Sequence, residues 1–301
     1  MSIHEESMSV SAAVGNLIAS DFPKVDYTDE DVKKALSEYS EDELAKMKEL
    51  GIISDDFELF YVIREFCSSL GLDDVADDEY ILEIFKNAKK LDADEFESDP
   101  YMKLFVDDVK SGDIFLTHSE YERGEIFQYD MPDLNARVVA LKLGFFTRKV
   151  RFPALYQGVM PWVSVCPSEI NSMSEQIKKA HGKVLVLGLG LGYYPYMISS
   201  KDCVSEIVIV EIEPKIIDVF EKNLLPQFPN KEKISVVCAD AIEYMKGVKA
   251  GDFDFIFADI WEGAVDGAPL YDRIKAHEKR LAKTEFTYWI EDQIRCYEAE
   301  K

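Results

Sequence analysis

Five short apolar runs in the C-terminal half constrain the fold of this chain more than any other feature. They recur at intervals of roughly 20–30 residues, with helix-like segments between them. Nearly unbroken apolar runs are buried on both faces, and parallel strands need crossover connections, so the pattern predicts an α/β fold with a Rossmann-like, doubly wound, mostly parallel sheet. The expected strands are KVLVLG, EIVIVE, KISVVCAD, FDFIFAD and TEFTYWIE, at residues 183–188, 206–211, 233–240, 253–259 and 284–291.

The N-terminal third of the chain has a helical pattern and a strong excess of acidic residues. Apolar residues recur at helical spacing, and Asp and Glu crowd the first turns, where they favour the positive end of the helix dipole. Residues 1–115 hold 30 Asp and Glu against 11 Lys and Arg, in a chain with a formal net charge of −24. We expect an acidic helical domain here, with helices at residues 29–40, 41–50, 55–71 and 77–91.

This charge limits the partners of the protein. A strongly negative field repels a phosphate backbone, whose binding depends on Lys and Arg, so nucleic acid is a disfavoured partner. A cationic or neutral small-molecule substrate fits the charge better. The acidic surface also has a simpler explanation, which is solubility without any binding function.

Between these two parts lies a stretch rich in β-branched and aromatic residues, interrupted by Gly144, Pro153, Gly158 and Pro161. Its composition predicts a small antiparallel sheet. The segment PSEINSMSEQIKKAHG then has the signature of a helix with Ser168 as its cap, leading into the first buried strand. We expect an acidic helical domain at 1–113, a small antiparallel β segment at 114–166 and a Rossmann-like domain at 167–301.

The cysteines and histidines give no sign of a metal site. The five cysteines lack CxxC spacing, and His118, His181 and His277 stand far apart in the sequence. We expect reduced thiols and no bound metal. The first residues lack a basic stretch followed by a long apolar run, and no 18-residue apolar run occurs, so we expect a cytoplasmic protein without a membrane span.

The turn after the first buried strand carries three alternating glycines, in GLGLG at residues 188–192. Such a strand-to-helix turn lets a ligand approach the backbone beside a helix N-terminus. A dinucleotide fingerprint GxGxxG would place glycine at position 193, where this chain has Tyr193. A nicotinamide dinucleotide is therefore disfavoured as the ligand.

With this GxGxG turn and the acidic residues that end the next strands, the sequence resembles class I S-adenosylmethionine-dependent methyltransferases. The resemblance implies S-adenosylmethionine as the cofactor. It gives Glu211 the ribose hydroxyls and Asp240 the adenine amino group as partners, and it places Asp259 at the reactive sulfonium end. From position alone, Glu211 ends a strand beside the switch-point crevice, or merely caps the following turn. The implied cofactor-binding residues are Gly188, Gly190, Gly192, Glu211, Asp240 and Asp259.

Residues 183–275 also resemble the spermidine synthase-like branch of this superfamily. The shared features are VEIEP after the second strand, an acidic pair in DIWEG and the pair Leu270-Tyr271. The chain departs from the pattern in two places, because Leu191 replaces the aspartate of the glycine loop and Glu262-Gly263 replaces an acid followed by proline. The roles of those residues in holding a polyamine and removing its proton therefore do not transfer directly.

Three functions remain open from the sequence. The first is methyl transfer from S-adenosylmethionine to a small molecule, and the second is spermidine synthase-like aminopropyl transfer. The third is a non-catalytic module that binds the nucleoside, since fold alone does not define function. Asp259 is the candidate base, with Glu262 and Tyr271 in reserve.

Two further details bear on the site and on assembly. Ser168 and Glu169 could reach the methionine moiety, although a plain helix cap is the preferred interpretation, and Trp261 is expected to pack rather than to stack on a substrate. After the fifth strand only about eleven residues follow, so the sheet should be shortened at its C-terminal edge. An uncovered edge favours association, and we expect a homodimer.

Overall fold

The computed structural model describes residues 2–72, 79–106 and 108–299. It divides into an N-terminal unit, Met1–Glu97 with Glu120–Arg151, and a C-terminal unit, Ser98–Ser119 with Phe152–Lys301. These bounds differ from the three parts expected from the sequence, because the stretch at 114–166 contributes strands to two separate sheets. Each unit is therefore built from discontinuous segments.

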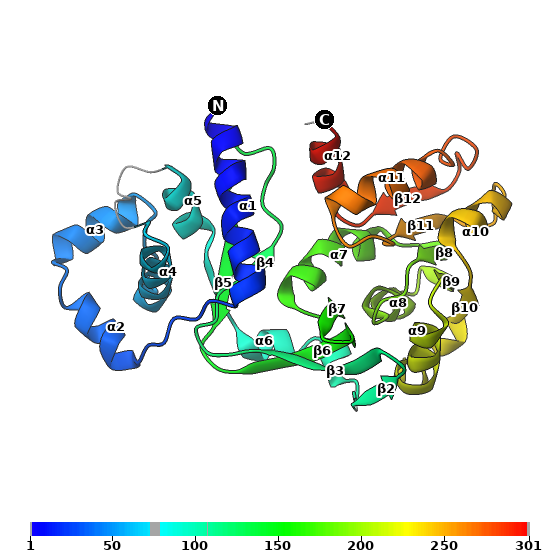
Figure 1. Cartoon of the computed structure of the whole chain (residues 1–301), viewed down its shortest axis with the longest axis horizontal. Coiled ribbons are helices and arrows are strands. Elements are labelled where there is room, and N and C mark those ends of the chain that lie inside the picture. The colour runs from blue at the N-terminus through cyan, green and yellow to red at the C-terminus, as the bar shows by residue number, and fades with distance from the viewer. Residues whose placement is uncertain (1, 73–78, 107, 300–301) are drawn as a thin grey trace. The chain divides into compact units, whose positions relative to one another are not determined.

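The N-terminal unit packs helices against a small mixed sheet (Figure 1). Three of its helices begin with a capping box at Ser2, Thr28 or Ser40, in which the side chain accepts a backbone N–H and an acidic residue bonds back. The helices are α1 Ile3–Asp21, α2 Asp29–Leu36, α3 Glu41–Glu49, α4 Phe57–Ser69, α5 Glu79–Asn87 and α6 Ala93–Glu97; the sheet has the order β1 Lys89–Leu91, β5 Lys142–Phe146, β4 Phe127–Asp130.

The apolar pattern of the sequence led to the wrong secondary structure before residue 29 and at residues 89–91. The first helix, α1, was not expected, and its weak apolar periodicity explains why. Residues 89–91, expected to end a helix, instead form β1, because their backbone pairs in parallel with β5. The start of that expected helix, at residues 77–78, lies outside the described residues.

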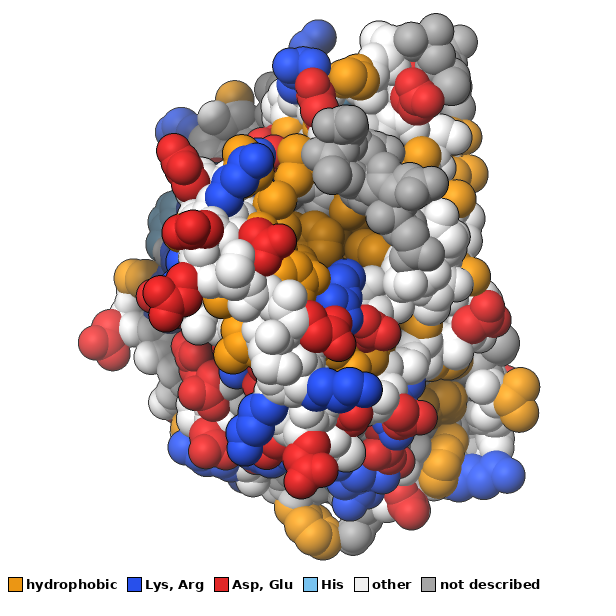
Figure 2. Space-filling view, turned by 90° about the vertical axis from the view of Figure 1, so that its left-hand side faces the viewer, with side chains coloured by type: hydrophobic (Ala, Val, Ile, Leu, Met, Phe, Trp, Pro, Cys, Tyr) orange, Lys and Arg blue, Asp and Glu red, His pale blue; other side chains and the backbone are white. Residues whose placement is uncertain are grey.

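Acidic side chains spread over the N-terminal unit, but many face a basic partner. Figure 2 shows red and blue side chains interspersed on the face at the left of Figure 1. Lys90, for example, contacts Asp56 and lies 2.9 Å from the Glu58 carboxylate. Local pairing thus accounts for part of the charge on this face.

The C-terminal unit contains the predicted parallel sheet, which is confirmed with all five strands. Its order is β10-β9-β8-β11-β12, and every neighbouring pair is parallel. The strands are β8 Gly182–Leu187, β9 Val204–Glu211, β10 Ile234–Cys238, β11 Phe255–Ala258 and β12 Glu285–Tyr288; the helices are α7 Pro167–Lys179, α8 Tyr193–Ser199, α9 Pro214–Val219, α10 Ala241–Gly247, α11 Ala264–Lys275 and α12 Glu291–Ala299.

The order of these strands fixes where a ligand can enter. From the central strand β8, the chain proceeds to β9 on one side and returns to β11 on the other. Helical connections leave β8 and β11 in opposite directions, which opens a crevice at their carboxyl ends. A second, four-stranded sheet of this unit has the order β2 Val109–Ser111, β3 Ile114–Tyr121, β6 Val150–Gln157, β7 Met160–Ser164.

Aromatic packing holds the glycine turn and its helix in place. Tyr194 stacks on Phe257 of β11 with ring centroids 4.0 Å apart, and its hydroxyl donates to the Gln176 carbonyl. The hydroxyls of Tyr193 and Tyr196 donate to Asp99 and to the Pro100 carbonyl. The three tyrosines of α8 therefore pack the domain, a point that the sequence left open.

Within the described residues, no helix combines the length and the apolar character needed to cross a membrane.

Candidate functional site

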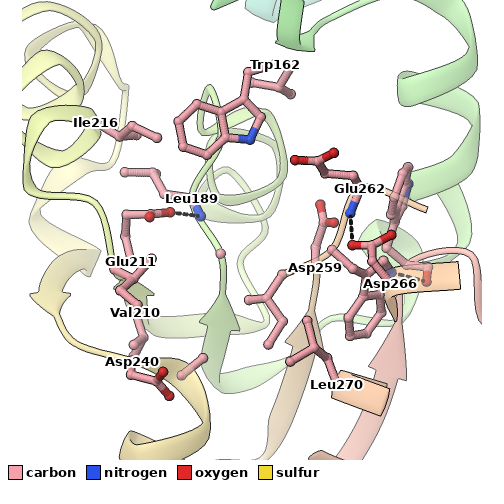
Figure 3. A pocket seen from close by; sticks show the side chains of 18 of the residues that line it. Trp162, Leu189, Val210, Glu211, Ile216, Asp240, Asp259, Glu262, Asp266 and Leu270 are labelled. Carbon is pink, nitrogen blue, oxygen red and sulfur yellow. Dashed lines mark hydrogen bonds between the residues drawn. The ribbon is translucent and has the colours of Figure 1, made fainter. Parts of the chain in front are cut away.

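A cavity of about 920 Å³ lies at the carboxyl ends of the parallel strands, and we call it the switch-point cavity (Figure 3). Its wall combines the glycine turn after β8, the ends of β9 and β10, the turn after β11, part of α11, the strand β7 and the first turn of α7. The volume lies near the upper end of the roughly 300–1,000 Å³ of small-molecule sites. The cavity is thus large enough for a nucleoside together with a small second substrate.

Two of the predicted glycines are required by close packing. Gly188 has φ +96°, and a Cβ there would lie 1.9 Å from the Asp259 carbonyl oxygen. Gly192 has φ +79°, and a Cβ there would lie 2.5 Å from the Phe220 ring. Gly188 and Gly190 line the cavity, whereas Gly192 begins α8 and faces Phe220.

Glu211 joins the end of β9 to the glycine turn. Its Oε2 accepts the Leu189 N–H at 3.0 Å, and its Oε1 accepts the Glu213 N–H at 2.8 Å (Figure 3). The side chain is 8% exposed and lines the cavity. Glu211 therefore fixes its own turn, and its carboxylate borders the cavity with lone pairs left to accept further donors. Its contact with ribose hydroxyls stays a prediction.

Asp240 also combines a structural contact with a place in the cavity wall. It is the N-cap of α10, where its Oδ1 accepts the Glu243 N–H at 2.9 Å. The residue is exposed, and its Oδ2 has no hydrogen bond to another described residue. That oxygen remains available to a ligand amine.

Asp259 and Glu169, both partly buried, bring two carboxyl groups to the same cavity. Burial raises the pKa of Glu169 from 4.5 to about 7. Burial also raises the pKa of Asp259 well above its usual range, and the nearby charge of Glu169 raises it further. Both groups therefore have reduced acidity while the cavity holds no ligand.

The position of Glu169 corrects the expectation for this helix. The prediction that Ser168 caps α7 is wrong, because Cys166 is the N-cap and the Ser168 hydroxyl lies 3.2 Å from the Cys166 sulfur. One residue further on, Glu169 faces the cavity. The sequence showed that Glu169 stands in the first turn of a helix that precedes the first buried strand. The side on which its side chain lies depends on how α7 packs, which no local pattern shows.

The turn after β11, which carries Glu262, is held by Asp266. Nothing in the sequence singled out this residue. Asp266, in the first turn of α11, accepts the backbone N–H groups of Glu262 and Gly263, each at 2.9 Å. Glu262 is exposed, and both acids line the cavity. Asp266 thereby fixes the turn that carries Glu262.

Tyr271 lies away from this group of residues. Its hydroxyl donates to Glu291 at 2.7 Å, accepts from Arg295 at 3.2 Å and contacts Lys275. These bonds join α11 to α12, whereas the preceding residue, Leu270, lines the cavity. Of the Leu-Tyr pair, Leu270 therefore lines the cavity and Tyr271 lies in the interior.

Two tryptophans differ in their surroundings. Trp261 is buried and its Nε1 donates to the Trp289 carbonyl at 3.3 Å, and it also borders the cavity. Trp162, on β7, lines the cavity and is 40% exposed (Figure 3). Trp162 reaches the cavity because the hairpin that carries it packs there. The local sequence around Trp162 therefore did not predict this position.

A charged tether helps to hold this hairpin beside the cavity. Asp113, in the turn between β2 and β3, accepts from Lys215 Nζ at 2.7 Å and from Gln157 at 3.0 Å. These two hydrogen bonds lower the pKa of Asp113 to about 2. Gln157 itself lines the cavity, so the tether links α9 to the cavity wall.

The charge of the cavity wall is strongly negative. Among the described residues that line it, Arg273 carries a positive side chain, and the acids are Glu169, Glu211, Asp240, Asp259, Glu262 and Asp266. No group of three or more His, Cys, Asp or Glu side chains within the described part of the chain is arranged to hold a metal ion. A wall of this kind favours an organic cation.

The parallel sheet, the glycine turn and the acidic strand ends, in which the sequence resembles S-adenosylmethionine-dependent methyltransferases, meet at one cavity in the structure. Comparison with known families gives the branch. Residues 166–280 match the family described as the spermine/spermidine synthase domain. Over these residues the resemblance to the spermidine synthase-like branch is confirmed.

Known proteins resemble the chain over part of its length. Putrescine N-methyltransferase 4 of Nicotiana tabacum is 29% identical over 94 residues, which are 30% of this chain and 24% of that enzyme. The spermidine synthase structure from Thermotoga maritima shows 15% identity and a TM-score of 0.33, covering 46% of this chain and 53% of its own. A spermidine synthase in complex with a transition state analogue shows 20% identity and a TM-score of 0.30, covering 37% and 43%.

Proposed function

We propose that this protein transfers a methyl group from S-adenosylmethionine to a small amine. The observation that supports the proposal most is the meeting of Gly188, Gly190, Glu211 and Asp259 in one cavity at the switch point of a parallel sheet. A nucleoside bound at this place in the fold needs carboxylates that accept its hydrogen bonds and a glycine turn whose backbone it can approach closely. When bound, the cofactor would supply an electrophilic methyl group on a sulfonium.

The residues would act in the following way. Glu211, held by two backbone N–H groups, would accept hydrogen bonds from the ribose hydroxyls, and the Asp240 Oδ2 would accept one from the adenine amine. Asp259 would hold the acceptor amine and take its proton as the nitrogen–carbon bond forms and the carbon–sulfur bond breaks. Burial raises the pKa of Asp259 in the ligand-free protein, and the positive charge of a bound ligand would favour the ionised form that takes the proton.

An amine acceptor is favoured by the acidic wall and by the likeness to an enzyme named as a putrescine N-methyltransferase. Methyl transfer is placed first because of the glycine turn. Leu191 stands where the spermidine synthase-like pattern has an aspartate, and its side chain is buried, with 2% exposed. That position supplies no carboxylate to hold an aminopropyl ammonium group.

Aminopropyl transfer is the second candidate. It is supported by the match to the spermine/spermidine synthase domain and by the acidic cavity wall, whose negative charge would repel the methionine carboxylate of the ordinary cofactor. Decarboxylated S-adenosylmethionine lacks that group. The two candidates therefore differ in the cofactor that should bind more tightly.

The test compares ligands and products directly. Isothermal titration would give the affinities of S-adenosylmethionine, its decarboxylated form, S-adenosylhomocysteine and methylthioadenosine, and mass spectrometry would identify products formed with putrescine. S-adenosylhomocysteine and a methylated amine are expected. Methylthioadenosine with an extended amine would support the second candidate, and binding without any product would contradict both.

A further inference from the structure

We propose that Glu169 and Asp259 form a carboxyl pair that keeps a proton while the switch-point cavity is empty and releases it to solvent when an organic cation binds. The inference rests on the proposed function, because the cation would be the sulfonium of the cofactor or an ammonium group of the acceptor. It adds to that function a second acidic residue and a measurable coupling between binding and protonation.

The geometry of the pair is the first support. Glu169 comes from the first turn of α7 and Asp259 from the residue after β11, and both line the same cavity. Both residues are partly buried in the cavity wall. Neither carboxyl group makes a hydrogen bond to another described side chain or backbone group. Two partly buried acids without a hydrogen-bond partner among the described residues line one cavity, where an incoming cation could pair with them.

The rest of the wall does not neutralise them. Glu211 and Asp266 each accept two backbone N–H groups and are held by those bonds. Arg273, on α11, is the basic side chain among the described lining residues, and it has no ion pair or hydrogen bond with either member of the pair. The remaining acids of the wall, Asp240 and Glu262, add further negative charge.

Electrostatics then determines the protonation state. Two partly buried carboxylates that share one cavity repel each other, and burial disfavours the charged form of each, so the pair keeps a proton in the neutral pH range. This agrees with the raised pKa of both groups. A bound cation supplies the missing positive charge and makes the fully ionised pair favourable, so the proton leaves. A neutral ligand gives no such compensation.

The experiment is isothermal titration of the full chain at about pH 7, repeated in buffers of different ionisation enthalpy, which yields the number of protons released per ligand. We expect close to one proton released on binding S-adenosylmethionine or putrescine. Methylthioadenosine, which carries no cationic centre, should release almost none. Release by S-adenosylmethionine alone would assign the cation as the sulfonium, and release by putrescine alone would assign it as the ammonium.

Glu169→Gln is the decisive variant, because it keeps the size of the side chain and removes its charge. Proton release should fall close to zero, and affinity for the cations should fall about tenfold, while methylthioadenosine affinity stays within about twofold. Glu175→Gln is the matched control on the same helix, since Glu175 is exposed and pairs with Lys178. It should behave as the unchanged protein.

The possible failures are distinguishable. Tight nucleoside binding with equal proton release in the Glu169→Gln variant would overturn the pair and leave the proposed function standing. If none of the nucleosides or amines binds, the proposed function fails. The pair is then judged by infrared spectroscopy of the ligand-free protein, where the protonated-carboxyl band present near neutral pH must be lost in Glu169→Gln but not in Glu175→Gln.

Discussion

At the scale of single residues, the acids of the switch-point cavity fall into two kinds. Glu211, Asp240 and Asp266 are bound by backbone N–H groups, which fixes their direction. Glu169 and Asp259 lack such bonds and have raised pKa values. The first kind is prepared to accept hydrogen bonds from a ligand, and the second is prepared to respond to its charge.

Replacement of Glu211 should affect both binding and stability. Glu211→Ala removes the acceptor of two N–H groups, so we expect a loss of about 1–3 kcal/mol in the free energy of unfolding and a loss of measurable nucleoside binding. Urea denaturation and isothermal titration measure the two effects. Glu206→Ala, near the start of the same strand, where the side chain is half-exposed and pairs with Lys183, should change stability by less than about 0.5 kcal/mol. Unchanged nucleoside affinity in Glu211→Ala would contradict the ribose assignment.

Glu169 should make the stability of the ligand-free protein depend on pH. Its pKa is higher in the folded protein than in the unfolded chain, so between pH 4.5 and about 7 the folded state binds more protons and stability falls as pH rises. Glu169→Gln should therefore raise the free energy of unfolding at about pH 8, by at most about 3 kcal/mol, and by much less near pH 4.5. Denaturation at several pH values measures this. A variant whose stability follows the same pH curve as the original protein would disprove the effect.

At the scale of elements, the glycine turn between β8 and α8 determines the shape of the cavity floor. It must pass close to the end of β11, as Gly188 shows, and close to Phe220, as Gly192 shows. Gly190 has more room, since its nearest neighbour would be Val163 at 3.6 Å from a Cβ. The three glycines therefore serve different purposes despite their equal spacing.

Substitution by alanine should reveal this difference. Gly188→Ala should destabilise the protein by about 3 kcal/mol or more, because its Cβ would overlap the backbone of Asp259. Gly190→Ala should cost only about 1 kcal/mol, the penalty of a positive φ, while its methyl group obstructs the cavity wall. Chemical denaturation ranks the two variants. Equal losses of stability would show that the close approach at Gly188 is not limiting.

At the scale of the whole molecule, the net charge of −24 acts on any charged ligand. The field of the protein should attract amines before they reach the cavity, and salt should weaken that attraction. Residues 166–280 match a known domain, whereas the N-terminal unit lies outside the match. The expected homodimer stays a prediction.

The salt dependence of binding tests this long-range effect. Raising sodium chloride from about 0.05 M to about 0.5 M should lower the affinity for putrescine severalfold and leave methylthioadenosine affinity nearly unchanged. Titration calorimetry at each salt concentration makes the comparison. An equal response of the charged and the neutral ligand would show that the net charge plays no part in recognition.

The sequence by itself determined the five buried strands, their parallel arrangement and the positions of Gly188, Glu211, Asp240 and Asp259. These follow from local periodicity and from residues at strand ends, and parallel strands bring their carboxyl ends to one edge wherever the rest of the chain lies. Only the tertiary structure decided that Glu169 and Trp162 face the cavity, that Tyr271 bonds to α12, and that the stretch at 114–166 divides between two units. Those outcomes depend on contacts between residues far apart in the chain, which no local pattern contains.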